Sequence, residues 1–313
     1  MARIGTFLWL AALASPVLAT AQAVTTPAIP GVVAAGTAVE VVKEDVGGTE
    51  GPVGMADGGI LFTSGSTIQR VAPDGSVSVW MPKTNGANGL AYDSRGRLVA
   101  VETGAEPGPR IAIIAPAGEE RVLVDGYQGK PFIRPNDLVL DTRGGVYFTD
   151  PAPRPAVAGD RLSEPSNVYY LRPDGRLLLL DNRMRRPNGV QLSPDGWTLY
   201  VADTILEDII AFDVQADGSV ANGRVFAKYL GTGPEGSGGD GMAVDAEGRL
   251  YATSINGVQV FSPRGEHLGT ITLPRQPQNV AFAGPGRAYL YVVGRGGVYR
   301  VKTQTEGVRT RVK

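Results

Sequence analysis

Six polar residues recur at one position in six similar segments of the chain, each just before an apolar strand and a tight turn. In four of the segments an Asp or Ser follows the polar residue at an offset of five, as from Asn136 to Asp141. The six are Glu50, Asn88, Asn136, Asn188, Asp240 and Gln278. All carry oxygen donors, which hard divalent cations prefer. If the segments repeat around an axis, these residues form a ring that can hold such a cation.

Four members of this set are the predicted metal ligands. Glu50 and Asp240 supply two carboxylates, which balance a 2+ charge, and Asn136 and Asn188 supply neutral carbonyl oxygens. Because no sulfur or imidazole is among them, we expect one divalent cation, Ca²⁺ first, with Zn²⁺, Mn²⁺ and Mg²⁺ as alternatives. Asn-Gly is also a strong hairpin signal, so Asn88 and Asn188 taken singly fit turns equally well. The shared register, which includes residues that are not Asn-Gly, favours the ring.

Further polar residues are predicted to contact a substrate. The second strand of each segment returns to the same face, so its last residues line the rim of the ring. Arg134, two residues before Asn136, can bind an anionic group or an oxyanion. A salt bridge from Arg134 to Asp137 or Asp150 fits the sequence as well. The predicted substrate-binding residues are Asn88, Glu102, Arg134, Asp150 and Gln278.

The elements that must position these residues are short strands. The chain has 43 Gly and 23 Pro, which punctuate it at intervals instead of forming a linker. From Gly59 to Gly286 the inner turns are on average about 45 residues apart, and a second turn lies between them. Repeats of that length with four strands each are typical of a β-propeller. In the third repeat the expected strands are 137–141, 145–149, 167–172 and 176–181.

Closure of the ring indicates six blades. The last repeat has three strands, at 280–283, 288–293 and 298–302, and we expect 38–43 (AVEVVK) to supply the fourth. Five or seven blades would leave strands unpaired. The prediction is an all-β, six-bladed propeller over residues 38–303, with an extension at 24–37 and a polar tail at 304–313. A closed ring has no free sheet edge, which favours a monomer.

Residues 1–23 resemble a cleavable secretory signal. Arg3 precedes an apolar run from Thr6 to Leu18, and Ala21-Gln22-Ala23 offers a cleavage site. The run is shorter than the ~20 residues of a membrane span. We therefore expect a periplasmic or secreted protein. Zero Cys excludes disulfides and thiolate chemistry, and a net charge of −1 without a basic stripe disfavours nucleic-acid and membrane partners.

Several familiar catalytic motifs are missing or misleading. The GTGPEG segment at 231–236 matches a dinucleotide-binding loop, but no crossover helix follows it. The single histidine, His267, is expected on an outer strand, so a Ser-His or Cys-His dyad cannot form at the ring. Chemistry at the ring is therefore metal-based or absent.

The repeated segments resemble the senescence-marker-protein/gluconolactonase/luciferin-regenerating-enzyme family. The resemblance runs from about Val39 to Val301 and is carried by segments such as TEGPVGMADGGILFTS, RPNDLVLDTRGGVYFTDP, RPNGVQLSPDGWTLYVADT and GDGMAVDAEGRLYATS. It implies that Glu50, Asn136, Asn188 and Asp240 bind a catalytic divalent cation, that Asp240 is the base, and that Arg134 contacts substrate. Many relatives carry a His where this chain has Thr103.

Ring and resemblance together predict a metal-dependent lactonase acting on a small lactone or ester, with Asp240 and Arg134 as catalytic residues. The cation polarises the lactone carbonyl, and Asp240, or water that it orients, supplies the hydroxide equivalent. The long loop 151–166 is expected to act as a lid. Three alternatives stay open. They are a phosphotriesterase or arylesterase with an apolar channel mouth, a non-catalytic periplasmic binding propeller with a structural calcium, and a quinone-dependent sugar dehydrogenase, for which the usual His base is missing.

Overall fold

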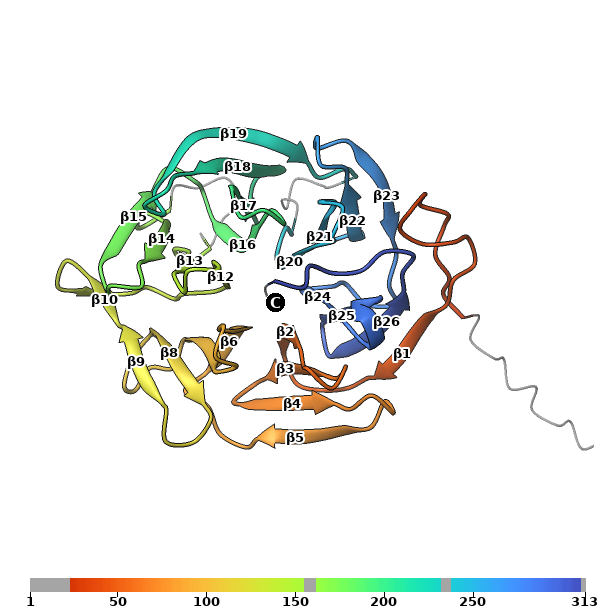
Figure 1. The fold of residues 1–313 in the computed structure, drawn as a ribbon, viewed down its shortest axis with the longest axis horizontal. Coiled ribbons are helices and arrows are strands. Elements are labelled where there is room, and N and C mark those ends of the chain that lie inside the picture. The colour runs from red at the N-terminus through yellow and green to blue at the C-terminus, as the bar shows by residue number, and fades with distance from the viewer. Residues whose placement is uncertain (1–22, 155–161, 232–237, 311–313) are drawn as a thin grey trace, which may run out of the picture.

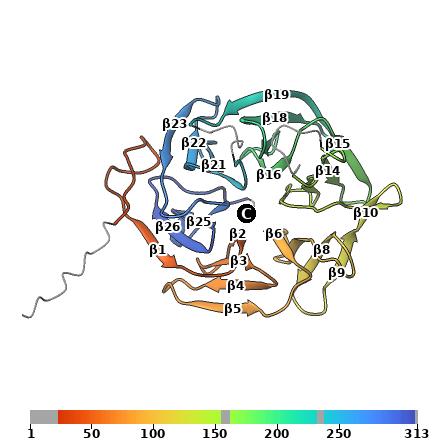
Figure 2. The same cartoon turned by 180° about the vertical axis from the view of Figure 1, so that it is seen from behind.

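The computed structural model describes residues 23–154, 162–231 and 238–310. Six four-stranded antiparallel sheets are arranged around a central channel (Figures 1 and 2). The described residues add one two-stranded hairpin, β10 (Gly126–Tyr127) with β11 (Lys130–Pro131), and one 3₁₀ turn, η1 (Pro285–Arg287). The predicted all-β, six-bladed propeller is confirmed. The predicted signal segment, most of the GTGPEG loop and the middle of the 151–166 loop lie outside the described residues.

Blades 1 to 5 each run outward from the channel in chain order. Blade 1 contains β2 (Thr49–Gly54), β3 (Ile60–Ser64), β4 (Thr67–Val71) and β5 (Val77–Met81). Blade 2 contains β6 (Ala87–Tyr92), β7 (Leu98–Glu102), β8 (Arg110–Ala115) and β9 (Arg121–Val124). Blade 3 contains β12 (Leu138–Leu140), β13 (Val146–Asp150), β14 (Asn167–Leu171) and β15 (Leu177–Asp181).

The second half of the ring follows the same plan. Blade 4 contains β16 (Pro187–Leu192), β17 (Thr198–Asp203), β18 (Asp208–Val214) and β19 (Val220–Lys228). Blade 5 contains β20 (Met242–Val244), β21 (Leu250–Ser254), β22 (Gly257–Phe261) and β23 (His267–Ile271). Blade 6 contains β24 (Asn279–Ala283), β25 (Tyr289–Gly294), β26 (Gly297–Lys302) and, outermost, β1 (Val39–Lys43).

The outer strand of blade 6 comes from the start of the chain. β1 pairs antiparallel with β26, with Val39 opposite Val301 and Val41 opposite Tyr299. The expected strands of blades 3 and 6 lie within two residues of the observed ones. His267 opens β23, the outermost strand of blade 5.

The core lies between neighbouring blades. One cluster joins Val101 and Ile113 of blade 2 to Phe148 and Tyr169 of blade 3. Both faces of a middle strand are therefore covered, and all five residues of β13 are buried. This explains why these strands are nearly continuous apolar runs without clear alternation.

Tight turns that contain glycine close the inner hairpins, and an Asp side chain supports several of them. Asp141 accepts hydrogen bonds at Oδ1 from the backbone N–H groups of Arg143 and Gly145, and Gly144 adopts a φ of 90°. Asp93 and Asp245 form equivalent turns. The offset of five therefore spans one inner strand. We call the end of the channel where these strands begin the start face, and the end where they turn the turn face.

The segments on either side of the propeller pack against it. Ile29, Val32 and Val33 are fully buried in a cluster with residues of blades 5 and 6. After β26 the chain runs back toward the channel (dark blue in Figure 1), where Gly307 bridges Asp245 and Val308 is largely buried. The first part of the segment predicted as a polar tail is therefore docked on the turn face.

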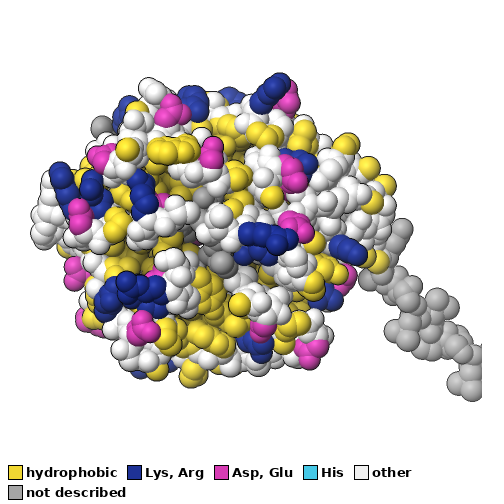
Figure 3. Space-filling view, viewed as in Figure 1, with side chains coloured by type: hydrophobic (Ala, Val, Ile, Leu, Met, Phe, Trp, Pro, Cys, Tyr) yellow, Lys and Arg dark blue, Asp and Glu magenta, His cyan; other side chains and the backbone are white. Residues whose placement is uncertain are grey.

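On the face seen in Figure 3, Lys and Arg side chains alternate with Asp and Glu instead of forming one basic stripe. Within the parts of the chain that the structure describes, no helix is long and apolar enough to cross a membrane.

Candidate active site

A cavity of about 430 Å³ opens at the start face on the channel axis. All six residues of the predicted ring line it, and so does Arg134. The full lining is Glu50, Asn88, Arg134, Asn136, Arg154, Arg186, Asn188, Thr204, Gly238, Asp240, Ile255, Gln276, Gln278 and Arg295. Residues from six separate blades therefore meet at one point, as the register predicts.

Irregular starts of the inner strands bring the ring residues to the axis. Pairing of β2 with β3, β6 with β7 and β16 with β17 shifts register directly after Glu50, Ala87 and Pro187. Such bulges bend a strand and re-aim a side chain. Asn136 and Asp240 lie two residues before the first residue of β12 and β20. Asn88 and Asn188 thus lie within strands, and the hairpin-turn interpretation of the Asn-Gly pairs is wrong.

Glycines after the ring residues allow neighbouring blades to approach closely. A Cβ added to Gly189 would lie 2.0 Å from the backbone oxygen of Asp240, and one on Gly51 would lie 2.0 Å from that of Asn88. A Cβ on Gly241 would lie 1.9 Å from the Asn279 side chain. These contacts are too short for any other residue, so the Gly after Glu, Asn or Asp is a packing requirement.

Side chains also link each blade to the next. The Thr149 hydroxyl donates to the backbone oxygen of Asn188 at 2.6 Å, and the Thr253 hydroxyl donates to that of Gln278 at 3.0 Å. Asn88 Nδ2 donates to the backbone oxygen of Asn136 at 3.0 Å. Backbone oxygens of the ring are therefore engaged, while the side-chain oxygens of Asn136 and Asn188 remain available to the cavity.

Three predicted ligand atoms are buried and unpaired. Asn136 Oδ1, Asn188 Oδ1 and Asp240 Oδ1 have no hydrogen-bond partner among the described residues. The amide orientation of Asn188 is set by its Nδ2, which donates to Thr204 Oγ1 at 3.0 Å. Leaving a buried acceptor unsatisfied costs about 1–3 kcal/mol. Three such atoms in one cavity fit a site that a cation completes.

The two carboxylates repel each other in the absence of a cation. Burial, with the charge of Asp137, raises the pKa of Glu50 to about 7, against hydrogen bonds from Asn279 and Gln278. Burial, with the charges of Glu50 and Asp137, also raises the pKa of Asp240 well above its usual value. A bound divalent cation favours the charged form of both groups.

The donor set therefore fits a hard cation. It consists of two carboxylates and two amide oxygens, and the described residues contain no group of three or more His, Cys, Asp or Glu side chains that could hold a metal ion without the amides. The amides Asn136 and Asn188 are thus essential members of the proposed ligand set.

Asp150 positions Arg134 and does not line the cavity. Its Oδ1 accepts the backbone N–H of Arg134 at 2.7 Å, and its Oδ2 accepts that of Ile133 at 3.1 Å. Burial raises the pKa of Asp150 to about 6. The Arg134 side chain forms no ion pair with a described residue, so neither of the salt bridges considered for it, to Asp137 or Asp150, is present.

Glu102 lies elsewhere and is a correction to the predicted substrate contacts. It accepts hydrogen bonds from Arg110 Nε and, at 3.3 Å, from the backbone N–H of Asn85, and it lines a separate cavity of blade 2. Its side chain turns away from the axis because Glu102 ends β7 opposite Ala87, outside the bulge that aims Asn88 inward. Thr103 likewise donates to the backbone oxygen of Gly86.

The sequence reasoning missed three arginines of the cavity: Arg154, Arg186 and Arg295. One signal was available for Arg186, since Arg-Pro-Asn occurs twice and places Arg186 before Asn188 as Arg134 stands before Asn136. Arg154 and Arg295 lie in connections between strands, where the repeat gives no register. Asn279, which donates to Glu50 at 3.2 Å, was also missed.

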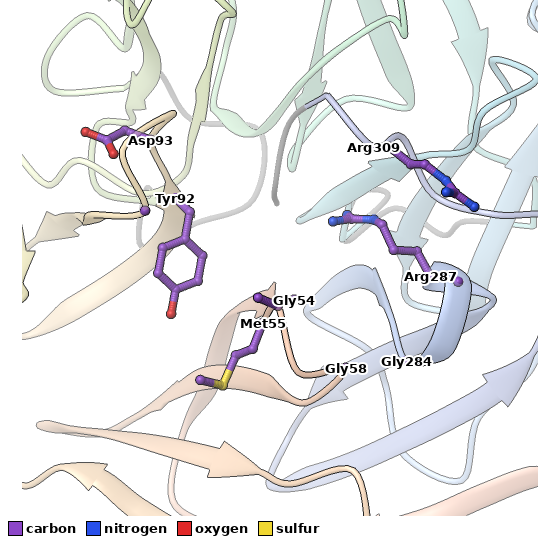
Figure 4. Close-up of a pocket in the computed structure, with 11 residues that line it drawn as sticks. Gly54, Met55, Gly58, Tyr92, Asp93, Gly284, Arg287 and Arg309 are labelled. Carbon is purple, nitrogen blue, oxygen red and sulfur yellow. The ribbon is translucent and has the colours of Figure 1, made fainter.

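A second cavity, of about 530 Å³, lies at the turn face (Figure 4). Met55 and Tyr92 line it together with Arg287 and Arg309, and no ring residue takes part. It is larger than the start-face cavity but holds none of the predicted ligands.

Fold and cavity define a class: a six-bladed propeller with an oxygen-lined axial site. A family model described as the SMP-30/gluconolactonase/LRE-like region matches residues 48–295. The chain belongs to this family.

Named relatives agree with the class. A gluconolactonase of Zymomonas mobilis is 32% identical over 309 residues, covering 90% of this chain and 85% of the relative. The solved structure of a gluconolactonase from Xanthomonas campestris is 29% identical, with a TM-score of 0.75, covering 92% of this chain and 99% of that one. A calcium-binding regucalcin from Agrobacterium tumefaciens shares the fold, with a TM-score of 0.71 at 21% identity over 87% of this chain and 95% of that one. The two gluconolactonases support lactone hydrolysis.

Proposed function

We propose that this protein is a metal-dependent lactonase whose ligands are Glu50, Asn136, Asn188 and Asp240. The observation that carries the proposal is the convergence of three buried, unpartnered oxygens with a fourth donor, Glu50, in one axial cavity. Ca²⁺ is the first choice, because all four donors are oxygens and two are anionic. When bound, the cation supplies a Lewis acid that polarises the lactone carbonyl.

The chain's own residues account for the remaining chemistry. The Asp240 carboxylate takes a proton from the attacking water, whose oxygen bonds to the ring carbonyl carbon. The ring C–O bond then breaks, and the proton passes to the released hydroxyl oxygen. Arg134 is held at its backbone by Asp150, and its guanidinium stabilises the carboxylate that forms.

The lining of the cavity disfavours the esterase alternative. Ile255 is the only large apolar side chain among the lining residues that the structure describes. An arylesterase or phosphotriesterase needs an apolar mouth for its substrate, whereas amides, carboxylates and arginines suit a polar lactone.

The signal-like N-terminal segment supports a periplasmic or secreted location, which fractionation of tagged cells tests.

Lactone hydrolysis, followed with a pH indicator, tests the proposal on metal-stripped protein. Ca²⁺, Mn²⁺, Mg²⁺ or Zn²⁺ is restored singly, and the substrates include aldonolactones, dihydrocoumarin and paraoxon. We expect metal-restored turnover of the aldonolactones that is lost in Asn188→Ala. Asn222→Ala, in the exposed outer strand β19, is the matched control. A metal that raises the melting temperature without turnover of any substrate would instead indicate a binding propeller with a structural ion.

A further inference from the structure

Four arginines converge on the cavity without a carboxylate to pair with. Arg134, Arg154, Arg186 and Arg295 line it, against the two acids Glu50 and Asp240. None of the four lies within 4 Å of a carboxylate of the described residues. Eleven arginines elsewhere do, namely Arg70, Arg97, Arg110, Arg143, Arg172, Arg183, Arg224, Arg249, Arg275, Arg300 and Arg309. What distinguishes these four arginines is that they line one cavity and have no such partner there.

Three of the four share one wall. Arg134 and Arg154 flank the inner part of blade 3, and Arg186 precedes β16 of blade 4. Arg186 Nε donates to the backbone oxygen of Ala152 at 3.4 Å, which holds it beside the segment that carries Arg154.

Arg295 faces this wall from blade 6. It lies in the turn between β25 and β26 with a φ of 48°, a left-handed conformation that a non-glycine residue adopts at a cost. Its backbone N–H donates to Gln278 Oε1 at 2.9 Å, which fixes the turn beside the ring. Strained residues of this kind are concentrated at functional sites.

The formal charge of the lining favours an anionic ligand. Four arginines and two acids leave the described part of the lining at +2, and a divalent cation would make it +4, while the whole chain carries −1. The buried acids Asp137 and Asp203 lie nearby and offset part of this charge. A neutral lactone offsets none of this charge. One arginine is enough for the carboxylate that ring opening creates, so the others are free for a second anionic group.

Resting on the lactonase function proposed above, we propose that the natural substrate is a lactone with an anionic group, carboxylate or phosphate, remote from the ring carbonyl. Arg154 and Arg186 hold that group, with Arg295 contributing from the opposite wall. Arginine suits this role because its planar fork binds a carboxylate or phosphate through two hydrogen bonds.

Matched pairs of lactones test the inference. D-Glucaro-1,4-lactone is compared with D-glucono-1,4-lactone, and 6-phospho-D-glucono-1,5-lactone with D-glucono-1,5-lactone, all on the Ca²⁺-loaded full-length protein. We expect kcat/KM to be at least about tenfold higher for the charged member of one pair, and that pair identifies carboxylate or phosphate. We also expect added NaCl to lower kcat/KM for the charged lactone more steeply than for its neutral partner.

Substitutions of Arg154 and Arg186 test whether these two residues cause the preference for a charged lactone. Arg154→Gln and Arg186→Gln should raise KM for the charged lactone at least about tenfold more than for its neutral partner. Arg95→Gln is the control, since this exposed arginine lies in the turn after β6, at the turn face, and should change neither.

The outcomes separate the two proposals. Hydrolysis of neutral lactones as fast as the charged ones, with equal effects of each variant on both, would overturn the inference and leave the lactonase intact. Absence of hydrolysis for all four lactones would remove the lactonase proposal and this inference with it.

Discussion

At the residue scale, a small number of oxygens carries the candidate chemistry. Asn136, Asn188 and Asp240 each present a buried oxygen to the cavity without a protein partner, and Glu50 completes the set. Such atoms are costly unless something outside the chain satisfies them. The ring is therefore better explained by a bound cation than by the stability of the fold.

Asp240→Asn tests whether Asp240 acts as a general base in addition to binding the cation. The amide keeps an oxygen at the ring but cannot take a proton from water at neutral pH. We expect kcat to fall at least about 100-fold, the usual range for losing a general base, while the melting temperature of the Ca²⁺-loaded protein stays within a few degrees. Steady-state hydrolysis of an aldonolactone and a thermal melt measure the two effects. Turnover close to that of the unmodified protein would exclude Asp240 as the base.

The pKa of Glu50 gives a second prediction, for the metal-free protein. Because its folded pKa is raised to about 7 from an ordinary 4.5, the folded state binds the proton more tightly than the unfolded state. Stability from this group is complete below about pH 4.5 and is lost as pH rises through about 7. The melting temperature with chelator should therefore fall between pH 5 and 8, and the gain on adding Ca²⁺ should grow over the same interval.

Glu50→Gln is the control for that titration. It removes the ionisable group, so the fall in the metal-free melting temperature should become smaller. A Ca²⁺-induced gain that is the same at pH 5 and pH 8 would contradict the assignment of Glu50 to the cation site.

The sequence predicted the ring residues because all six occur at one register of a repeated segment. The prediction failed for residues whose position in the repeat does not determine where the side chain points. Glu102 ends a strand at the correct face, but its side chain turns to Arg110, since a one-residue bulge decides which strand-end residues face the axis. Arg154 and Arg295 lie in connections, and only three-dimensional closure of the blades brings them together.

At the element scale, each inner strand must begin close to its neighbour. Its tight turn lies at the other end, so the length of the strand sets the distance between start face and turn face. The strands were predictable to within two residues in blades 3 and 6, because turn glycines with positive φ mark their ends. The β10–β11 hairpin was not predicted, since its strands have only two residues each.

Gly189→Ala tests the close approach of blades 4 and 5. The added Cβ would lie 2.0 Å from the Asp240 backbone oxygen, so the inner strands of blades 4 and 5 would have to separate. This separation would increase the distance between the proposed ligands Asn188 and Asp240. We expect a loss of about 1–3 kcal/mol in unfolding free energy and weaker Ca²⁺ binding. Urea unfolding and calorimetric titration measure these.

Gly47→Ala is the matched control, because a Cβ there has no atom within 4 Å. It should leave both quantities unchanged. Equal Ca²⁺ affinity in the two variants would show that the approach of blades 4 and 5 does not set the ligand spacing.

At the scale of the whole molecule, the ring is held closed by segments from both ends of the described chain. β1 covers β26, and residues Ile29, Val32 and Val33 pack beside it on blades 5 and 6. Outer strands elsewhere are partly exposed, as in β5, whereas five of the six residues of β26 are buried or half-buried. The burial of β26 therefore depends on β1, which pairs with its outer edge.

Stepwise truncation tests this closure. A chain that begins at residue 38 loses the extension but keeps β1, whereas a chain that begins at Glu44 also loses β1 and exposes Tyr299 and Val301. We expect the first truncation to lower the melting temperature, and only the second to cause association through the uncovered edge of β26, because exposed apolar edges pair with other strands. Light scattering after gel filtration distinguishes the two, and Val41→Thr, an exposed position on β1, serves as the control. A monomeric, fully active chain beginning at Glu44 would show that the ring holds its ligands together without β1.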